Sequence, residues 1–242
     1  MDFTMELAGV KIAVHSLFDE VYELCRDYLC QGTGAFSVST TLQDIAFERE
    51  TSRREAARMG QPEYPFSDGY LETLAVYRKI TLGLLDYDTI LMHGAAVCVN
   101  GEAYLFTAPS GTGKTTHVRL WLDTIPGAFV VNGDKPLIRV GKEGCEVFGT
   151  PWAGKEGWNQ NTSAPLRAIC LLERGRENEI EEIHFPAALS ILVQQTHRPH
   201  EAGAMARTLE LIGRLSGSLR FYRLACNMDP DAARVSFEGM RS

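Results

Sequence analysis

The sequence predicts an α/β protein with a mixed sheet, in which a β-hairpin leads into a glycine-rich loop and helices flank the strands. Two observations carry this prediction. The dipeptide Asn100-Gly101 separates two apolar runs, which is a strong hairpin signal, and the second run ends directly at SGTGKTT, residues 110–116. A small α+β region comes before this core, so we expect two domains, residues 1–88 and 89–242.

The N-terminal domain is expected to combine short strands with helices. Residues 4–16 contain two apolar runs around a central Ala-Gly pair, which predicts two strands joined by a turn. Residues 17–29 follow with apolar residues at helical spacing. Residues 41–60 predict a charged, exposed helix and residues 67–88 an amphipathic one, because glycine and prolines interrupt the chain between them.

The second domain is expected to contain strands that alternate with helices. Strand-type runs occupy residues 89–99, 102–108, 127–131, 136–140, 166–175 and 219–227. Helical stretches occupy residues 115–122, 186–195, 203–217 and 229–240. Within the third run, Phe129 to Val131 are typical of a buried strand.

Composition excludes several classes of protein. With 242 residues, of which 45% are hydrophobic and 23% charged, the chain has ordinary globular usage and room for two modules at most. Its net charge of −7 argues against a protein that coats nucleic acid or an anionic membrane, so an anionic substrate must be captured by a local site. The six cysteines form no CxxC pair, which argues against a zinc site or a disulfide framework.

The N-terminal sequence favours a cytoplasmic protein. The stretch MDFTMELAGV carries acidic residues where an export signal needs basic ones. No apolar run reaches the length of a membrane span. We therefore expect neither export nor a membrane anchor.

The stretch APSGTGKTT, residues 108–116, nearly matches the phosphate-binding loop GxxxxGK[ST] and lacks only its first glycine, which is Ala108 here. The run before it predicts a strand and the stretch after it predicts a helix, as such a loop requires. A chance GxGK[ST] in a chain of this composition arises about once in a hundred. A purely structural glycine turn is therefore the minor alternative.

The loop predicts ATP and Mg²⁺ as cofactors, because closely spaced backbone N–H groups and a helix N-terminus surround an anion. Lys114 is expected to reach the β- and γ-phosphates, Thr115 to offer its hydroxyl to Mg²⁺, and Thr116 to contact a neighbouring phosphate oxygen. The cofactor-binding residues are then Ser110, Gly111, Thr112, Gly113, Lys114, Thr115 and Thr116.

His93 and Asp134 are expected beside the phosphates. Counting outward from the hairpin turn puts His93 opposite Ala108, although a lone histidine in a strand can also be a packing residue with one satisfied nitrogen. Asp134 follows a predicted buried strand, where phosphoryl transfer needs a carboxylate, although Asn-Gly-Asp-Lys-Pro is also an ordinary turn. We predict Asp134, His93 and Lys114 as catalytic residues, and Thr115 with Asp134 as metal ligands.

These residues resemble the catalytic domain of HPr kinase/phosphorylase and, more distantly, ATP-dependent phosphoenolpyruvate carboxykinase. The resemblance covers residues 89–200 and rests on HGAAV, on the loop and on the strand that ends in NGD. It implies that a β-hairpin enters the loop. It also implies that His93 corresponds to the family's histidine near the catalytic acid, Lys114 to its phosphate-binding lysine, and Thr115 to its magnesium-binding hydroxyl.

The sequence departs from that family at one position and matches it weakly at another. HPr kinases have two adjacent aspartates where this chain has Gly133-Asp134, so the division of tasks between base and metal ligand falls on a single carboxylate. The stretch THRPHE is similar to the family's basic loop after the core. By that similarity Arg198 is a further catalytic residue, as a phosphate clamp.

The segment GTPWAGKEGWNQNTSAP, residues 149–165, is predicted to be a long loop because its tryptophans, glycines and amides lack periodicity. Long loops inside compact domains are usually functional. Lys155 and the rings of Trp152 and Trp158 are candidates to line an acceptor pocket or to stack on the nucleotide. The alternative is that Trp152 anchors the loop in the core.

The leading functional hypothesis is a Mg²⁺-ATP-dependent kinase that acts on a hydroxyl, most readily a serine, of a protein, peptide or small molecule. A nucleotide-binding regulatory module without catalysis is the alternative of another class, since the second carboxylate is missing. A carboxykinase-type transfer needs a second metal site and more arginines than so short a chain supplies. The expected partners are ATP and an acceptor, with no nucleic acid or membrane, and a homo-oligomer stays open.

Overall fold

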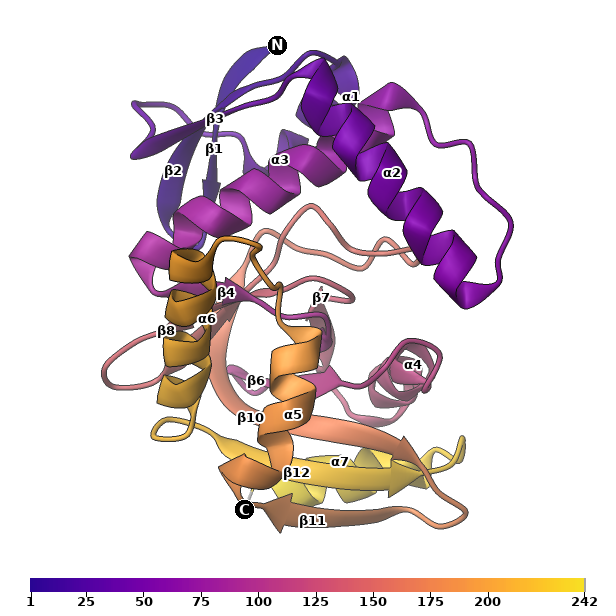
Figure 1. Cartoon of the computed structure of the whole chain (residues 1–242). Coiled ribbons are helices and arrows are strands. Elements are labelled where there is room, and N and C mark those ends of the chain that lie inside the picture. The colour runs from indigo at the N-terminus through magenta and orange to yellow at the C-terminus, as the bar shows by residue number, and fades with distance from the viewer. Residues whose placement is uncertain (242) are drawn as a thin grey trace. The chain divides into compact units, whose positions relative to one another are not determined.

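The computed structural model describes residues 1–241, without the side chain of Met59. The chain divides into two compact units, Met1–Leu84 and Leu85–Ser242 (Figure 1). Among residues 1–241 no helix is both long enough and apolar enough to cross a membrane. All six cysteines are unpaired thiols.

The first unit is a small α+β structure built on a three-stranded sheet. Its elements are β1 (Asp2–Leu7), β2 (Val10–His15), α1 (Asp19–Leu24), the 3₁₀ turn η1 (Arg26–Tyr28), β3 (Phe36–Ser39), α2 (Leu42–Met59) and α3 (Asp68–Leu84). β2 lies in the middle, antiparallel to β1 and parallel to β3. The two predicted strands and the two long helices are present, whereas β3 was not predicted.

Glu72 on α3 ties this unit together. The side chain is fully buried and its carboxylate accepts hydrogen bonds from the backbone N–H groups of Leu17 and Phe18, at 2.6 and 2.8 Å, and from the Thr40 hydroxyl. The first two donors lie where α1 begins. Buried carboxylates persist where donors surround them in this way, so Glu72 has a structural role.

The second unit carries a mixed sheet and flanking helices. Its elements are η2 (Leu85–Tyr87), β4 (Thr89–Leu91), β5 (Ala95–Val99), β6 (Glu102–Thr107), α4 (Lys114–Thr124), β7 (Phe129–Asn132), β8 (Leu137–Val140), β9 (Cys145–Phe148), β10 (Ser163–Arg174), β11 (Glu179–Ile183), α5 (Phe185–Gln195), α6 (Ala202–Leu215), β12 (Arg220–Cys226) and α7 (Asp231–Arg241). Two of these strands, β9 and β11, were not predicted.

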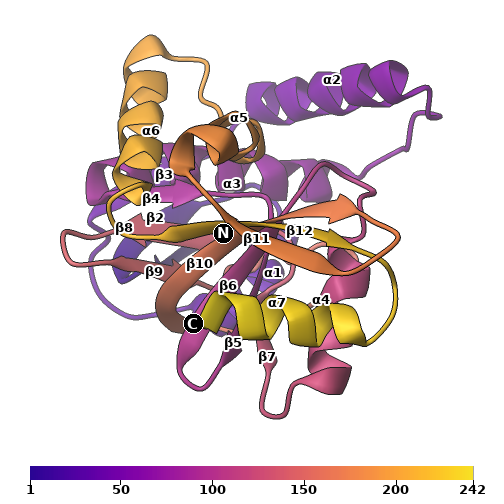
Figure 2. The same cartoon turned by 90° about the horizontal axis from the view of Figure 1, so that it is seen from below.

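The long strand β10 organises the sheet. Its first residues pair antiparallel with β9, which continues to β8 and β4, and its later residues lie between the parallel strands β6 and β12. β6 continues to β5 and β7, and β12 to β11, through antiparallel pairs. Figure 2 shows α4 and α7 on one face of this curled sheet and α5 and α6 on the other. The predicted mixed α/β architecture is therefore present.

The hairpin forms as predicted, but the strand before it is shorter than expected. Asn100 and Gly101 both adopt positive φ, 54° and 80°, as a tight two-residue turn requires. The ladder runs from Val99↔Glu102 to Ala95↔Phe106 and ends there. The predicted strand 89–99 is thus two strands, β4 and β5, separated by a bend.

The bend has a clear physical cause. The N–H of His93 donates to the Gln195 carbonyl at 2.7 Å, and the N–H of Gly94 donates to the Asp134 carbonyl at 2.9 Å. A Cβ at position 94 would lie 2.9 Å from the Phe106 carbonyl, so only glycine fits this close approach. These bonds to α5 and to the turn after β7 take the place of further hydrogen bonds in the hairpin ladder. A local sequence pattern cannot reveal them, because their partners are distant in the chain.

The strand β7 is less buried than predicted. Val130 and Val131 are buried, but Phe129 is 36% exposed. Phe129 is the first residue of β7, opposite Cys98 near the hairpin turn. Its position at the end of the strand explains why an apolar side chain there faces solvent.

Helix α4 is fixed to the core through a buried polar group. The Trp121 indole N–H donates to the Ser236 hydroxyl of α7 at 2.8 Å, and His117 Nε2 lies 3.2 Å from the same oxygen. His117 Nδ1 is buried and has no hydrogen-bond partner among residues 1–241. Burial lowers the pKa of His117 to about 4. The imidazole is therefore neutral in the folded protein at pH 7.

We expect acid to destabilise the protein through His117. Well above pH 6.5 the His117 imidazole is neutral in both the folded and the unfolded protein, so it does not lower the free energy of unfolding. As pH falls toward 4 the unfolded chain binds a proton that the native chain does not, and the free energy of unfolding decreases by roughly 3 kcal/mol. Urea titrations between pH 7 and about 4.5, the window set by the cited pKa values, should show a smaller decrease for His117→Gln. Parallel pH dependence in the two proteins would contradict this explanation.

Candidate functional site

A cavity of about 500 Å³ lies where β6 ends and α4 begins. It is formed by the bend before β5, the glycine-rich loop (residues 108–113), the start of α4, the turn after β7, and the segment 153–156. The lining residues are His93, Ser110, Gly111, Gly113, Lys114, Thr115, Gly133, Asp134, Ala153, Gly154, Lys155 and Glu156. The sequence-predicted residues His93, Lys114, Thr115 and Asp134 therefore share one cavity.

The glycine-rich loop presents backbone to this cavity. Gly111 and Gly113 have φ of 78° and 126°, and a Cβ at either position would meet no atom within 4 Å. The glycines are thus required for backbone conformation, and the space beside them is open. Ala108, which replaces the first glycine of the motif, is buried and lacks positive φ. An alanine Cβ therefore fits where the motif usually has glycine.

Lys114 opens helix α4 and folds back over the loop. Its Nζ donates to the Ala108 carbonyl at 2.8 Å. Burial lowers the pKa of Lys114, and the charge of Asp134 opposes that shift. The ammonium is thus partly desolvated in a cavity beside a helix N-terminus, whose first N–H groups have no partner inside the helix. This arrangement is suited to an anion.

The hydroxyl-bearing residues of the loop and the start of α4 differ in whether they line this cavity. Ser110 and Thr115 line the cavity, whereas Thr112 does not. The Thr112 hydroxyl donates to the Pro109 carbonyl at 2.8 Å, within the loop. Thr116 is exposed and lies outside the lining.

Asp134 is positioned by the buried amide of Asn132. The Asn132 oxygen accepts the N–H groups of Asp134 and Lys135 at 2.9 and 2.6 Å, and its amide nitrogen donates to the Thr150 carbonyl at 3.0 Å. The segment is therefore a side-chain-stabilised turn, as the alternative interpretation had it. The same turn directs the Asp134 carboxylate into the cavity.

His93 and Asp134 form a pair. His93 Nε2 lies 3.4 Å from Asp134 Oδ1, and His93 Nδ1 lies 2.7 Å from Gln195 Oε1. The His93 carbonyl accepts the Thr107 hydroxyl at 2.7 Å, so main chain and ring are both held. Nδ1 thus faces the amide oxygen of Gln195 and Nε2 faces the carboxylate of Asp134, and which ring nitrogen donates depends on the tautomer of the imidazole. One ring nitrogen therefore contacts the Gln195 amide, and the other points to Asp134.

The environment keeps Asp134 ionised. Burial raises the pKa of its carboxyl group. The contact with His93 and the charges of Lys135 and Lys114 outweigh burial, so the net pKa lies below the ordinary value. The carboxylate is therefore available at neutral pH to hold a cation or to accept a proton.

The tryptophan-rich loop supports the cavity, mainly through its backbone. Trp152 is buried, as the alternative interpretation had it, and neither tryptophan lines the cavity. The Trp158 carbonyl accepts the Gly133 N–H at 2.8 Å, which fastens the loop to the turn that carries Asp134. Lys155 does line the cavity, as the sequence suggested.

Two neighbours of Lys155 were missed from sequence. Gly154 packs so closely that a Cβ there would lie 3.0 Å from the Asp134 Cβ. Glu156 receives a hydrogen bond of 2.6 Å from Arg119 of α4, which anchors the segment beside the cavity. The only sequence signal was the length of the loop.

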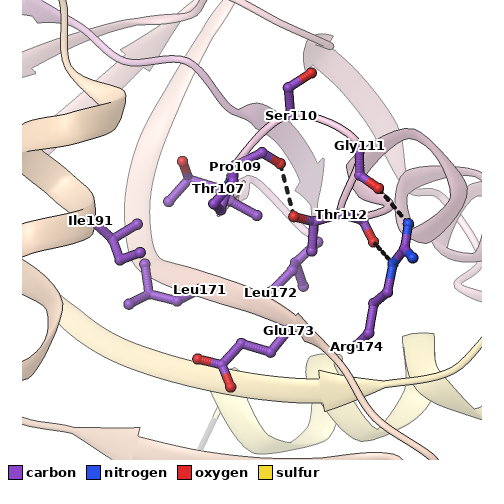
Figure 3. A pocket seen from close by; sticks show the side chains of 11 residues that line it. Thr107, Pro109, Ser110, Gly111, Thr112, Leu171, Leu172, Glu173, Arg174 and Ile191 are labelled. Carbon is purple, nitrogen blue, oxygen red and sulfur yellow. Dashed lines mark hydrogen bonds between the residues drawn. The ribbon is translucent and has the colours of Figure 1, made fainter. Parts of the chain in front are cut away.

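A second cavity, of about 480 Å³, also lies beside the glycine-rich loop (Figure 3). Ser110 and Gly111 line both cavities. The remaining lining consists of Thr107, Ala108, Pro109, Thr112, Leu171, Leu172, Glu173, Arg174 and Ile191. Two cavities therefore adjoin the loop, one lined by Asp134 and Lys114 and the other largely apolar.

The structure does not bring Arg198 into either cavity. Arg198 is exposed and is absent from both linings. It follows α5 in a segment that leads to α6, so its predicted role as a phosphate clamp has no geometric support. Within residues 1–241 no group of three or more His, Cys, Asp or Glu side chains could hold a metal ion. A cation at this site would need other oxygens, such as hydroxyls, water or a ligand.

Comparisons with known proteins gave matches among solved structures. No protein-family profile matches the chain, and no curated protein matches it. Among solved structures, the HPr(Ser) kinase/phosphatase from Coxiella burnetii matches 63% of this chain and 99% of its own chain, with 10% sequence identity and a TM-score of 0.34. The chain is therefore distantly similar in structure to an HPr(Ser) kinase/phosphatase, the family that its motifs resemble.

Proposed function

We propose that this protein is a Mg²⁺-ATP-dependent phosphotransferase that acts on a hydroxyl group of a protein, peptide or small molecule. One observation carries the proposal. Lys114, Thr115 and the open backbone of Gly111 and Gly113 share a cavity of about 500 Å³ with the paired side chains of His93 and Asp134. Phosphoryl transfer needs both halves of this arrangement, an anion cradle and an ionised acid beside it.

The residues present fit a phosphate-binding loop of the Walker type. The loop joins a strand to a helix, its glycines have positive φ, and its lysine is partly desolvated. Lys114 would bind the terminal phosphates. Thr115 and Asp134 would hold Mg²⁺, with the remaining positions taken by water and phosphate, as is usual for that ion. Mg²⁺ would neutralise the charge that develops on the phosphates.

The protein's own groups then have distinct tasks. Asp134, kept ionised, would accept the proton of the acceptor hydroxyl, and Nε2 of His93 would share it. The acceptor oxygen forms a bond to the γ-phosphorus while the bond between that phosphorus and the β,γ-bridging oxygen breaks, and ADP leaves. Gln195 holds the His93 ring at 2.7 Å, which keeps Nε2 directed at the carboxylate.

Transfer of label tests this function. The purified protein is incubated with γ-labelled MgATP and the proteins encoded next to it, with Lys114→Ala as the control. We expect labelled acceptor with the wild-type protein and none with the variant. Tight ATP binding without transfer would instead support a nucleotide-binding regulatory module. A protein that does not bind MgATP and does not transfer label would contradict the proposal altogether.

A further inference from the structure

Arg174 holds the glycine-rich loop from outside. It is the last residue of β10, and its Nη2 donates to the Gly111 carbonyl at 2.6 Å while its Nε donates to the Thr112 carbonyl at 3.3 Å (Figure 3). The position follows from the sheet. β10 runs parallel to β6, and Leu171 pairs with Thr107, the last residue of β6. Arg174 therefore extends past that strand, beside the loop that β6 enters.

The N–H that follows the Gly111 carbonyl, that of Thr112, donates to the Pro109 carbonyl at 3.3 Å within the loop, so the group whose direction matters is the N–H of Gly113, which follows the Thr112 carbonyl. In a trans peptide the carbonyl oxygen and the next N–H point in opposite directions. The Thr112 carbonyl points at Arg174, which lines the second cavity, so the N–H of Gly113 points away from Arg174. Gly113 lines the cavity that contains Lys114 and Asp134, and Arg174 does not.

The loop needs such a constraint because its glycines do not supply one. The bonds from Thr112 to Pro109 and from Lys114 to Ala108 restrain the loop in part, but Gly111 and Gly113 have no side chain and open space where a Cβ would be. Glycine loses more conformational freedom on ordering than any other residue. A ligand that needs the loop in one conformation would therefore be bound less tightly if the loop were free.

We propose that Arg174 is a positioning residue for polyphosphate, which orients the N–H of Gly113 toward the bound anion without contacting that anion. This inference rests on the proposed function and goes beyond it. Arginine suits the role because its planar guanidinium presents several donors in a fixed fork, which a lysine ammonium does not reproduce. The proposal commits to hydrogen bonding as the cause, as distinct from the positive charge.

Three variants separate these causes. Arg174→Met removes charge and donors, and Arg174→Lys keeps the charge but loses the fork. Arg176→Met is the matched control, because it removes the same charge from an exposed arginine two residues further along. Binding of inorganic tripolyphosphate and of MgATP is measured by calorimetry at about 50 mM and about 500 mM salt, since salt screens a charge effect but spares a local hydrogen bond. Melting of the unliganded proteins checks that each variant is folded.

We expect Arg174→Met and Arg174→Lys to weaken binding of both probes by about tenfold at either salt concentration, the order expected for hydrogen bonds that align donors to a charged ligand. Arg176→Met should bind like the wild type. Either of two results would overturn the inference while leaving the proposed function intact: wild-type affinity in Arg174→Lys, or a loss in Arg174→Met that vanishes at high salt. A folded wild-type protein that binds neither probe would instead refute the proposed function.

Discussion

We expect Lys114→Ala to abolish measurable MgATP binding while the protein stays folded. A triphosphate in this cavity would lose its ammonium partner in the loop, and the donors left in the loop are neutral N–H and hydroxyl groups. Folding has already removed part of the water around the Lys114 ammonium, so ligand binding pays little further desolvation free energy at this group. A charged hydrogen bond of this kind contributes about 2–5 kcal/mol, or a loss of 30-fold or more in affinity. Calorimetry with MgATP measures it directly.

The matched control for this experiment is Lys142→Ala. Lys142 is exposed, lies in the turn between β8 and β9, and lines neither cavity beside the loop. The Lys142→Ala variant therefore removes the same charge from the same unit of the protein. If Lys114→Ala bound MgATP as tightly as the wild type and Lys142→Ala, the assignment of the glycine-rich loop to phosphate binding would be wrong.

We expect Asp134→Asn to slow the proposed phosphoryl transfer by roughly 10²- to 10⁴-fold, the range for loss of a general base or of an aligned charge. The amide keeps the shape of the carboxyl group, and the turn that carries it is held by Asn132, so the fold should persist. The charge that holds a cation or accepts a proton is lost. Single-turnover transfer to an identified acceptor measures the chemical step.

Affinity for ATP with and without Mg²⁺ separates the two tasks of Asp134. If the carboxylate is mainly a metal ligand, affinity in the presence of Mg²⁺ falls and affinity in EDTA hardly changes. If it is mainly the base, both affinities survive and only transfer slows. We expect a mixture, because one carboxylate stands where the resembled family has two. Asp123→Asn, an exposed aspartate on α4, is the control. Full transfer by Asp134→Asn would reduce the carboxylate to a turn residue.

The parts of the site that could be predicted from sequence are the ones that local chemistry determines. A tight turn needs positive φ at two successive residues, and Asn100-Gly101 supplies it. The loop that follows β6 can be recognised from the spacing of its glycines and lysine. Asp134 was found because it directly follows a strand. Each of these signals lies within a few residues of the group it concerns.

The parts that could not be predicted depend on which distant segments meet. Gln195 holds His93 across 102 residues, and Arg174 holds Gly111 across 63. Nothing near either residue signals this, because both contacts arise from the order of strands around β10. The prediction that His93 lies opposite Ala108 came from extending the hairpin ladder, which in the structure ends at Ala95. Arg198, in contrast, was assigned by similarity alone and lies outside both cavities.

A crystal structure with Mg²⁺ and a non-hydrolysable ATP analogue tests the central claim most directly, because the claim is that the loop and the His93–Asp134 pair serve one ligand. We predict that the terminal phosphate lies in the cavity between Lys114 and Asp134, with the His93 ring close enough to reach it directly or through one water. A ring more than about 8 Å from every phosphate, beyond any such bridge, would contradict the account.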